Sequence, residues 1–171
     1  MTVKTLYRDG TWEIREEEAR LPDGRVKELE RAYRCDSVHV LAFVDASTIL
    51  LLREYRPFYG QWLWMIPSGK VDKERDIAAA AQRELQEETG YRARNLMHWF
   101  TTTHTESIVY ENHVFLARGL EPAPLQQDAH ELIEVKAMKI DEAVGLARSG
   151  KVRHTVSAYA LLRCALEKPS L

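Results

Sequence analysis

Residues 69 to 91 read GKVDKERDIAAAAQRELQEETGY, and more can be inferred from this stretch than from any other part of the chain. Asp76 to Thr89 has the composition of a helix, because it holds a run of four alanines, and alanine is the best helix former. Gly90 can end that helix in the left-handed conformation. The sequence therefore predicts one helix here, entered from a polar loop and closed by glycine.

Three glutamates, Glu84, Glu87 and Glu88, occupy relative positions 0, 3 and 4 of this helix and must share one side. Like charges at that spacing repel, so either solvent screens them or a cation organises them. A solvated acidic face is one interpretation; a site for a hard divalent cation, which prefers oxygen ligands, is the other. Arg83 stands four residues before Glu87, and the spacing predicts an ion pair between them.

An apolar stripe runs beside these carboxylates. Ala78, Ala81 and Leu85 fall on one side of the helix and can anchor it to a sheet, which would leave Glu84 and Glu88 at the border of the buried face.

The remainder of the chain predicts a mixed β-sheet with helices on its faces, an α/β fold. Apolar runs predict strands, and two amphipathic segments near the C-terminus predict helices. The expected strands are residues 38–44, 49–52, 62–66, 92–102, 108–117 and 132–139, and the expected helices are residues 141–149 and 155–166.

Residues 1–36 read as short polar strands, with turn residues in the segment LPDGR at 21–25. This antiparallel β segment has too few large apolar residues to be stable alone, so it should pack on the rest of the chain or on a partner subunit. We therefore divide the chain into an N-terminal β segment, 1–36, and a main domain, 37–171.

Composition is that of an ordinary globular protein of 171 residues, with 45% hydrophobic and 29% charged residues. The net charge of −2 gives no reason to expect nucleic acid as a partner. Cys35 and Cys164 are too few for a disulfide framework, and no signal peptide or membrane-spanning run is present, so we expect a cytoplasmic protein without membrane association.

The stretch from Gly69 to Tyr91 resembles the Nudix box, the pattern G-x5-E-x7-R-E-U-x-E-E-x-G-U in which U is apolar. One position departs from the pattern, because Arg75 stands where the first glutamate belongs and Glu74 precedes it by one residue. Glu74 could supply that charge through a small loop adjustment, or the role is lost. The positions that match are Gly69, Arg83, Glu84, Leu85, Glu87, Glu88 and Gly90.

This resemblance implies the Nudix fold, a β-sheet sandwiched between helices, and hydrolysis of a nucleoside diphosphate linked to another moiety with Mg²⁺ or Mn²⁺. Carried over by position, Glu84 and Glu88 would be metal ligands, and Glu87 a ligand or the partner of Arg83. The backbone carbonyl of Ser68 would be a further ligand. Metal ions at the phosphates would neutralise charge and lower the pKa of the attacking water.

Outside the box the sequence is similar to the branch of the family that hydrolyses ADP-ribose and nucleoside-diphosphate sugars. The segments that carry this similarity are LPDGR at 21–25, LLREYRP at 51–57 and PSGKVD at 67–72. The branch forms homodimers in which the N-terminal segment reaches the neighbouring subunit's site, and this implies a homodimer here.

The same resemblance suggests residues that bind substrate or activate water. Arg56, and less directly Arg53, could grip the pyrophosphate, because a guanidinium offers forked donors to phosphate oxygens. Glu111 is the expected base or additional metal ligand. The remaining candidates are Glu106 as the alternative to Glu111, His104 as a phosphate donor or base, and Gly69 as part of the substrate site.

Two other functions remain open at this point. The box alone is compatible with a nucleoside triphosphate, a dinucleoside polyphosphate or a capped RNA end as substrate, although the near-neutral charge counts against RNA. A Nudix fold used as a ligand-sensing module without chemistry is the third interpretation, supported only by Arg75.

Overall fold

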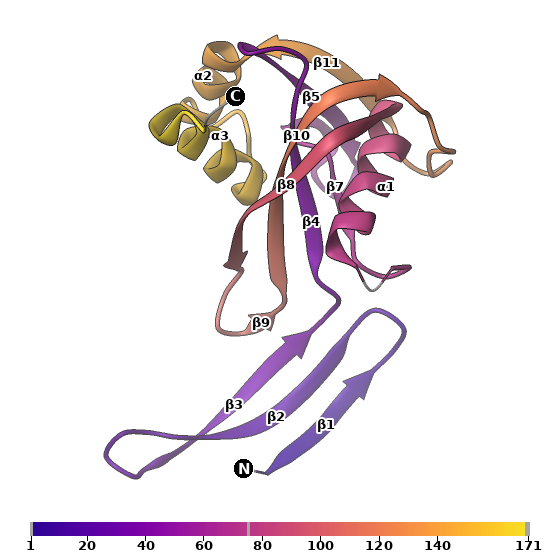
Figure 1. Cartoon of the computed structure of the whole chain (residues 1–171). Helices are drawn as coiled ribbons and strands as arrows, with labels where there is room; N and C mark the ends of the chain where they lie inside the picture. Colours follow the sequence, from indigo (N-terminus) through magenta and orange to yellow (C-terminus); the bar gives the residue numbers. More distant parts are fainter. Residues whose placement is uncertain (1, 75, 170–171) are drawn as a thin grey trace.

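A computed structural model describes residues 2–74 and 76–169 and contains two β-sheets joined by three short crossings of the chain (Figure 1). The larger sheet has the strand order β11-β5-β4-β10-β8, with β6 paired to β5 and β7 paired to β4. β10 runs parallel to β4 and antiparallel to β8, so the sheet is mixed, as predicted. Its strands are β4 (Ser37–Phe43), β5 (Thr48–Arg56), β6 (Gln61–Met65), β7 (Ser68–Lys70), β8 (Tyr91–Thr103), β10 (Glu111–Pro122) and β11 (Ile133–Lys139).

Helices cover both faces of this sheet. α1 (Ile77–Thr89) packs on one face, and α2 (Ile140–Arg148) with α3 (Thr155–Glu167) packs on the other (Figure 1). β4 is buried along its whole length, and its side chains alternate between the two layers. Val38 and Val40 join the cluster under α1, whereas Leu41 joins the cluster under α2 and α3. The predicted sandwich of a mixed sheet between helices is confirmed.

α1 forms where the sequence predicts it. The Asp76 side chain accepts a hydrogen bond from the Ala78 N–H at 3.0 Å and so caps the first turn. Gly90, with a φ of 78°, ends the helix in the left-handed region. Ala81 and Leu85 are fully buried against the sheet, which fixes the orientation of the carboxylates on the neighbouring side of the helix.

The smaller sheet stands away from the helices (Figure 1). It contains β1 (Val3–Arg8), β2 (Glu13–Arg20) and β3 (Val26–Tyr33) in antiparallel order, and β9 (Ile108–Val109) pairs in parallel with β3. Large apolar side chains of this sheet are exposed to solvent, namely Val3, Leu6, Tyr7 and Val26. The division at residue 36 falls in the link between β3 and β4, and whether the two parts are separate domains stays a prediction.

The single strand expected over residues 108–117 is wrong, because the chain changes sheets at Tyr110. β9 belongs to the small sheet and β10 to the large one. The guanidinium of Arg34, which lies in the crossing between β3 and β4, sits 4.5 Å from the centre of the Tyr110 ring. The apolar residues before and after the polar segment 111–113 read as one strand, and only long-range pairing to β3 and β4 shows where the segment divides.

The region before the box also differs in detail from the prediction. β5 extends to Arg56 rather than ending at Leu52, because β6 returns as a hairpin and pairs with its end. A 3-10 turn, η1 (Pro57–Tyr59), makes the connection. Among the described residues, no helix is long and apolar enough to cross a membrane.

Candidate active site

A cavity of about 690 Å³ opens where the acidic side of α1 meets the end of the large sheet. Its walls come from β4, β5, β7, α1, the loop before β11, and the residue that precedes α3. The residues that line the cavity include Arg56, Ser68, Gly69, Arg83, Glu84, Glu87, Glu88, Glu131, His39 and His154.

Glu88 is the most deeply buried of the α1 glutamates, with 6% of its surface exposed. Its carboxylate accepts a 2.7 Å hydrogen bond from the Ser68 N–H, which ties the helix to β7. Burial raises the pKa of Glu88 well above its usual range, and the neighbouring Glu84 adds to the rise. Burial likewise raises the pKa of Glu84. Oxygen ligands held this way, with their charge poorly solvated, fit a divalent cation, which would stabilise the ionised forms.

Arg83 neutralises the other carboxylates at this end of the helix. Its Nη1 lies 2.7 Å from both Glu84 and Glu87, and its Nε donates to Glu74 at 2.7 Å. Its Nη2 donates to the carbonyl of Lys70 at 3.0 Å. The predicted ion pair between Arg83 and Glu87 is confirmed.

The departure of the sequence from the Nudix box concerns two adjacent residues. Glu74, one place early in the sequence, reaches Arg83 and gives the motif's arginine an acidic partner. Arg75 itself lies outside the described residues, so its role stays a prediction.

Gly69 lets the backbone of β7 touch the Glu84 carboxylate. A Cβ atom built at this position would lie 2.0 Å from Cδ of Glu84, far inside van der Waals contact. Glycine here leaves the space that the Glu84 carboxylate occupies, and its φ angle is not unusual. The motif's first residue and its first helical glutamate are packed directly on each other.

The two arginines expected to bind phosphate lie in different surroundings in the structure. Arg56 lines the cavity, and its Nη2 lies 2.7 Å from Oε2 of the buried Glu54. Burial raises the pKa of Glu54, and Arg56 opposes that rise. Arg53 lies outside the cavity lining and pairs with Glu134 at 3.4 Å. Of these two arginines, Arg56 is the one placed to meet a ligand held by the α1 carboxylates.

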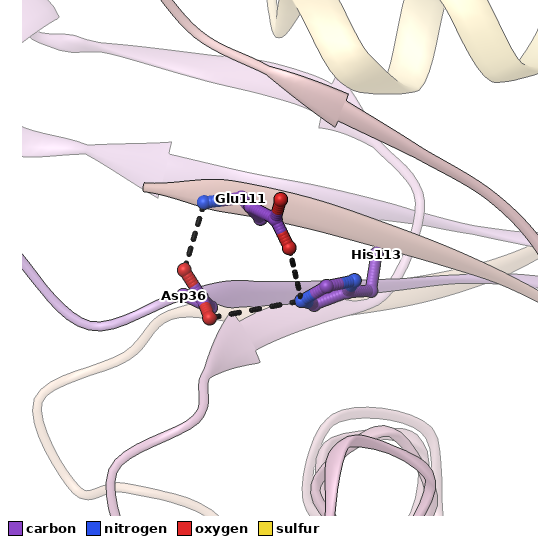
Figure 2. Close-up of side chains that lie close together, drawn as sticks. All are labelled: Asp36, Glu111 and His113. Carbon is purple, nitrogen blue, oxygen red and sulfur yellow. Dashed lines mark hydrogen bonds and ion pairs between the residues drawn. The ribbon is translucent and has the colours of Figure 1, made fainter. Parts of the chain in front are cut away.

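The loop candidates also lie outside the cavity lining. Glu111 sits beside Asp36 and His113 (Figure 2). Glu106 is largely exposed, 3.8 Å from Arg31. His104 places its ring 5.5 Å from that of Tyr110, centre to centre. The structure does not bring these side chains to the α1 glutamates, and their roles stay predictions.

Glu131 is a cavity residue to which the sequence alone does not point. It belongs to the loop between β10 and β11, and it lines the same cavity as Glu84 and Glu88. Burial and the nearby Asp128 raise its pKa, whereas Arg56 opposes the rise. The polar sequence around Glu131 does not predict that it lines the cavity, because loop residues have no periodicity that indicates where a side chain points.

A pair of histidines in the cavity was likewise missed. The His39 and His154 rings are 5.3 Å apart, centre to centre. Burial lowers the pKa of His39 to about 3 and that of His154 to about 4, so both are uncharged at neutral pH. His39 Nε2 lies 3.1 Å from Oδ1 of Asn112, and His154 Nδ1 lies 2.7 Å from the Ser157 hydroxyl. The two imidazoles therefore give one wall of the cavity polar groups that carry no charge.

Comparisons with known proteins agree with this geometry. The NUDIX domain model matches residues 33–159. The chain is 32% identical over 151 residues to an ADP-ribose pyrophosphatase of Bacillus subtilis, covering 85% of this chain and 80% of the relative. It is also 32% identical over 143 residues to a CMP-5'-(N-acetyl-N-hydroxy-3-aminopropyl)phosphonate hydrolase of Streptomyces rubellomurinus, covering 83% of this chain and 69% of the relative.

A solved structure titled as that of an ADP compounds hydrolase superposes with a TM-score of 0.81 at 22% identity, covering 99% of this chain and 94% of that one. Fold and site together define a hydrolase that cleaves pyrophosphate bonds. The chain belongs to the Nudix family.

The contact between Gly69 and Glu84 yields a prediction. Gly69→Ala should leave the protein folded, because the flexible Glu84 side chain can move, but turnover should fall at least roughly 100-fold since the carboxylate is displaced by an ångström or more. Steady-state hydrolysis and circular dichroism measure the two effects. Gly145→Ala is the matched control, since a Cβ there meets nothing within 4 Å. Equal activity of the two variants would contradict the proposed role of this contact.

Proposed function

We propose that the chain hydrolyses the pyrophosphate bond of ADP-ribose or a nucleoside-diphosphate sugar, releasing a nucleoside monophosphate and a sugar phosphate, with Mg²⁺ or Mn²⁺. The observation that carries this proposal is that Glu84, Glu88 and Arg56 line one cavity together with the backbone of Ser68 and Gly69. The similarity to an ADP-ribose pyrophosphatase over most of both chains supports this class of substrate.

The cavity suits a single nucleotide-sized ligand. Its volume of about 690 Å³ lies within the usual range for small-molecule sites. Arg56 offers forked donors to phosphate oxygens, and Lys70 and Lys73 add positive charge to the same lining. The neutral His39 and His154 side chains add polar groups but no cationic charge to this lining.

The α1 carboxylates are the groups that would hold the metal ion. Glu84, Glu88 and the backbone carbonyl of Ser68 are the proposed ligands, and Glu87 is a further ligand or the partner of Arg83. When bound, the cation supplies charge neutralisation for the pyrophosphate and a more acidic water. Arg83 positions Glu84 and Glu87, and the Ser68 N–H positions Glu88.

Glu131 is the proposed base that takes a proton from the attacking water. It enters the cavity from the loop before β11, on a different element from the α1 glutamates. Its raised pKa brings the carboxyl closer to the range that favours proton transfer near neutral pH. This assignment competes with Glu111, which the sequence suggests for the same role.

The substrate class is tested by a magnesium-dependent screen across ADP-ribose, nucleoside-diphosphate sugars, CMP-linked phosphonates, nucleoside triphosphates and dinucleoside polyphosphates. We expect the highest kcat/KM for ADP-ribose or a nucleoside-diphosphate sugar. Glu84→Gln and Glu88→Gln should each lower it at least roughly 100-fold, because charge stabilisation at the pyrophosphate is lost. Glu142→Gln, an exposed glutamate of α2, is the control. Preference for triphosphates, or unchanged activity of both variants, would refute the proposal.

The choice of base is tested by comparing two single substitutions. Glu131→Gln should lower kcat by roughly 100-fold or more with a small change in KM, as expected for loss of a general base. Glu111→Gln should have a much smaller effect, because Glu111 lies outside the cavity lining. A large loss of kcat in Glu111→Gln together with normal kcat in Glu131→Gln would reverse the assignment.

A second copy of the chain is the proposed partner of the N-terminal sheet. Three large side chains on β1 are each more than two-fifths exposed, namely Val3, Leu6 and Tyr7. A homodimer would bury this apolar surface. Sedimentation velocity of the full chain should give twice the mass of one chain, and Leu6→Asp should shift it toward the monomer. Leu166→Asp at the exposed end of α3 is the control. A monomeric wild-type protein would rule the dimer out.

A further inference from the structure

Three potential metal ligands meet where the two sheets join, outside the lining of the catalytic cavity. Asp36, Glu111 and His113 each offer one ligand atom, and these atoms lie within 4.8 Å of one another (Figure 2). Nε2 of His113 is 3.7 Å from Oδ2 of Asp36 and 3.7 Å from Oε2 of Glu111. Both distances exceed hydrogen-bond length, so the imidazole nitrogen points at two carboxylates without being bonded to either.

His113 is held rigidly in this position. Only 7% of its surface is exposed, and its Nδ1 lies 2.9 Å from the Thr101 hydroxyl. That hydroxyl is also 2.9 Å from Nε2 of His98. Thr101 can therefore accept the Nδ1–H of His113 and donate to His98, which leaves the lone pair of His113 on Nε2. A metal-binding histidine is oriented in this same way by a hydrogen bond to its second nitrogen.

The carboxylates are placed by the backbone. Oδ1 of Asp36 accepts the N–H of Glu111 at 2.8 Å, which leaves Oδ2 directed toward His113 (Figure 2). Glu111 and His113 are two residues apart on β10, so their side chains share one face of the strand. Asn112 between them lies on the other face, where it lines the catalytic cavity. The two sites therefore use opposite faces of the same strand.

We propose that Asp36, Glu111 and His113 bind a transition-metal ion of the Zn²⁺ class, with water completing its coordination. An imidazole nitrogen with two carboxylates suits Zn²⁺, Co²⁺ or Mn²⁺ better than Mg²⁺, which prefers an all-oxygen shell. Zinc bonds of about 2.1 Å place tetrahedral ligands about 3.4 Å apart, close to the 3.7 Å found from His113 to each carboxylate. The Glu111 side chain is 55% exposed and can make the remaining adjustment.

An ion here would fasten two of the three crossings between the sheets. Asp36 lies between β3 and β4, and Glu111 lies just after β9. The ion would thereby link the base of the N-terminal sheet to β10 of the main sheet. This inference does not rest on the proposed function, because neither the ligands nor the readouts below involve hydrolysis.

Cobalt absorption tests the site in the full chain. In a Glu84→Gln, Glu88→Gln background, which lacks the α1 carboxylates, Co²⁺ should produce visible d–d bands that saturate at one equivalent and disappear when Zn²⁺ is added. Asp36→Asn and Glu111→Gln in that background should weaken Co²⁺ binding at least tenfold, and His113→Gln should abolish the bands. Glu28→Gln, which removes an exposed carboxylate from β3, should change nothing.

A second measurement uses the unsubstituted protein, because replacing the buried His113 can itself prevent folding. Long-range ¹H–¹⁵N spectra should show the Nε2 resonance of His113 shifting on addition of one equivalent of Zn²⁺. The proposal is overturned if that resonance does not move, if no bands form in the background lacking the α1 carboxylates, or if bands persist in folded His113→Gln. Those outcomes would leave an ordinary ion-pair cluster of two carboxylates around His113.

Discussion

The contact between α1 and the backbone of β7 is the constraint on which the site depends. The Ser68 N–H donates a hydrogen bond to the buried Glu88, and Gly69 packs directly on the Glu84 carboxylate. Bringing ionised carboxylates together away from water is unfavourable unless other groups compensate. Fully buried Ala81 and Leu85 hold α1 against the sheet in spite of that repulsion. The apolar side of the helix thus stabilises the arrangement that its acidic side opposes.

Arg83 provides the second part of the compensation. One guanidinium contacts Glu74, Glu84 and Glu87 within 2.7 Å and also reaches the carbonyl of Lys70. It therefore joins the helix, the loop before it and β7 in a single network. This also explains how the chain accommodates Glu74 one place early in the motif. A flexible loop residue needs only to reach the guanidinium, whereas residues on the helix must keep their spacing.

The parts of the structure that could be predicted are those fixed by local periodicity. The spacing of Arg83 and Glu87 determines their ion pair, because four residues make about one helical turn. Glu131 could not be placed this way, since more than forty residues and three strands separate it from Glu88. His39 was hidden for a related reason. In an otherwise apolar strand it resembles a core residue, and only its packing beside His154 shows that it lines the cavity.

The charge distribution favours a cation in the proposed reaction. The residues from Gly69 to Gly90 contain four basic and six acidic side chains, a net charge of −2 that equals that of the whole chain. Two of the three arginines that line the cavity already have acidic partners, since Arg83 pairs with Glu74, Glu84 and Glu87 and Arg56 pairs with Glu54. An anionic pyrophosphate would therefore meet carboxylates whose charge these arginines only partly offset. A divalent cation at Glu84 and Glu88 would reverse the sign of the local charge. It would therefore contribute to binding the substrate as well as to cleaving it.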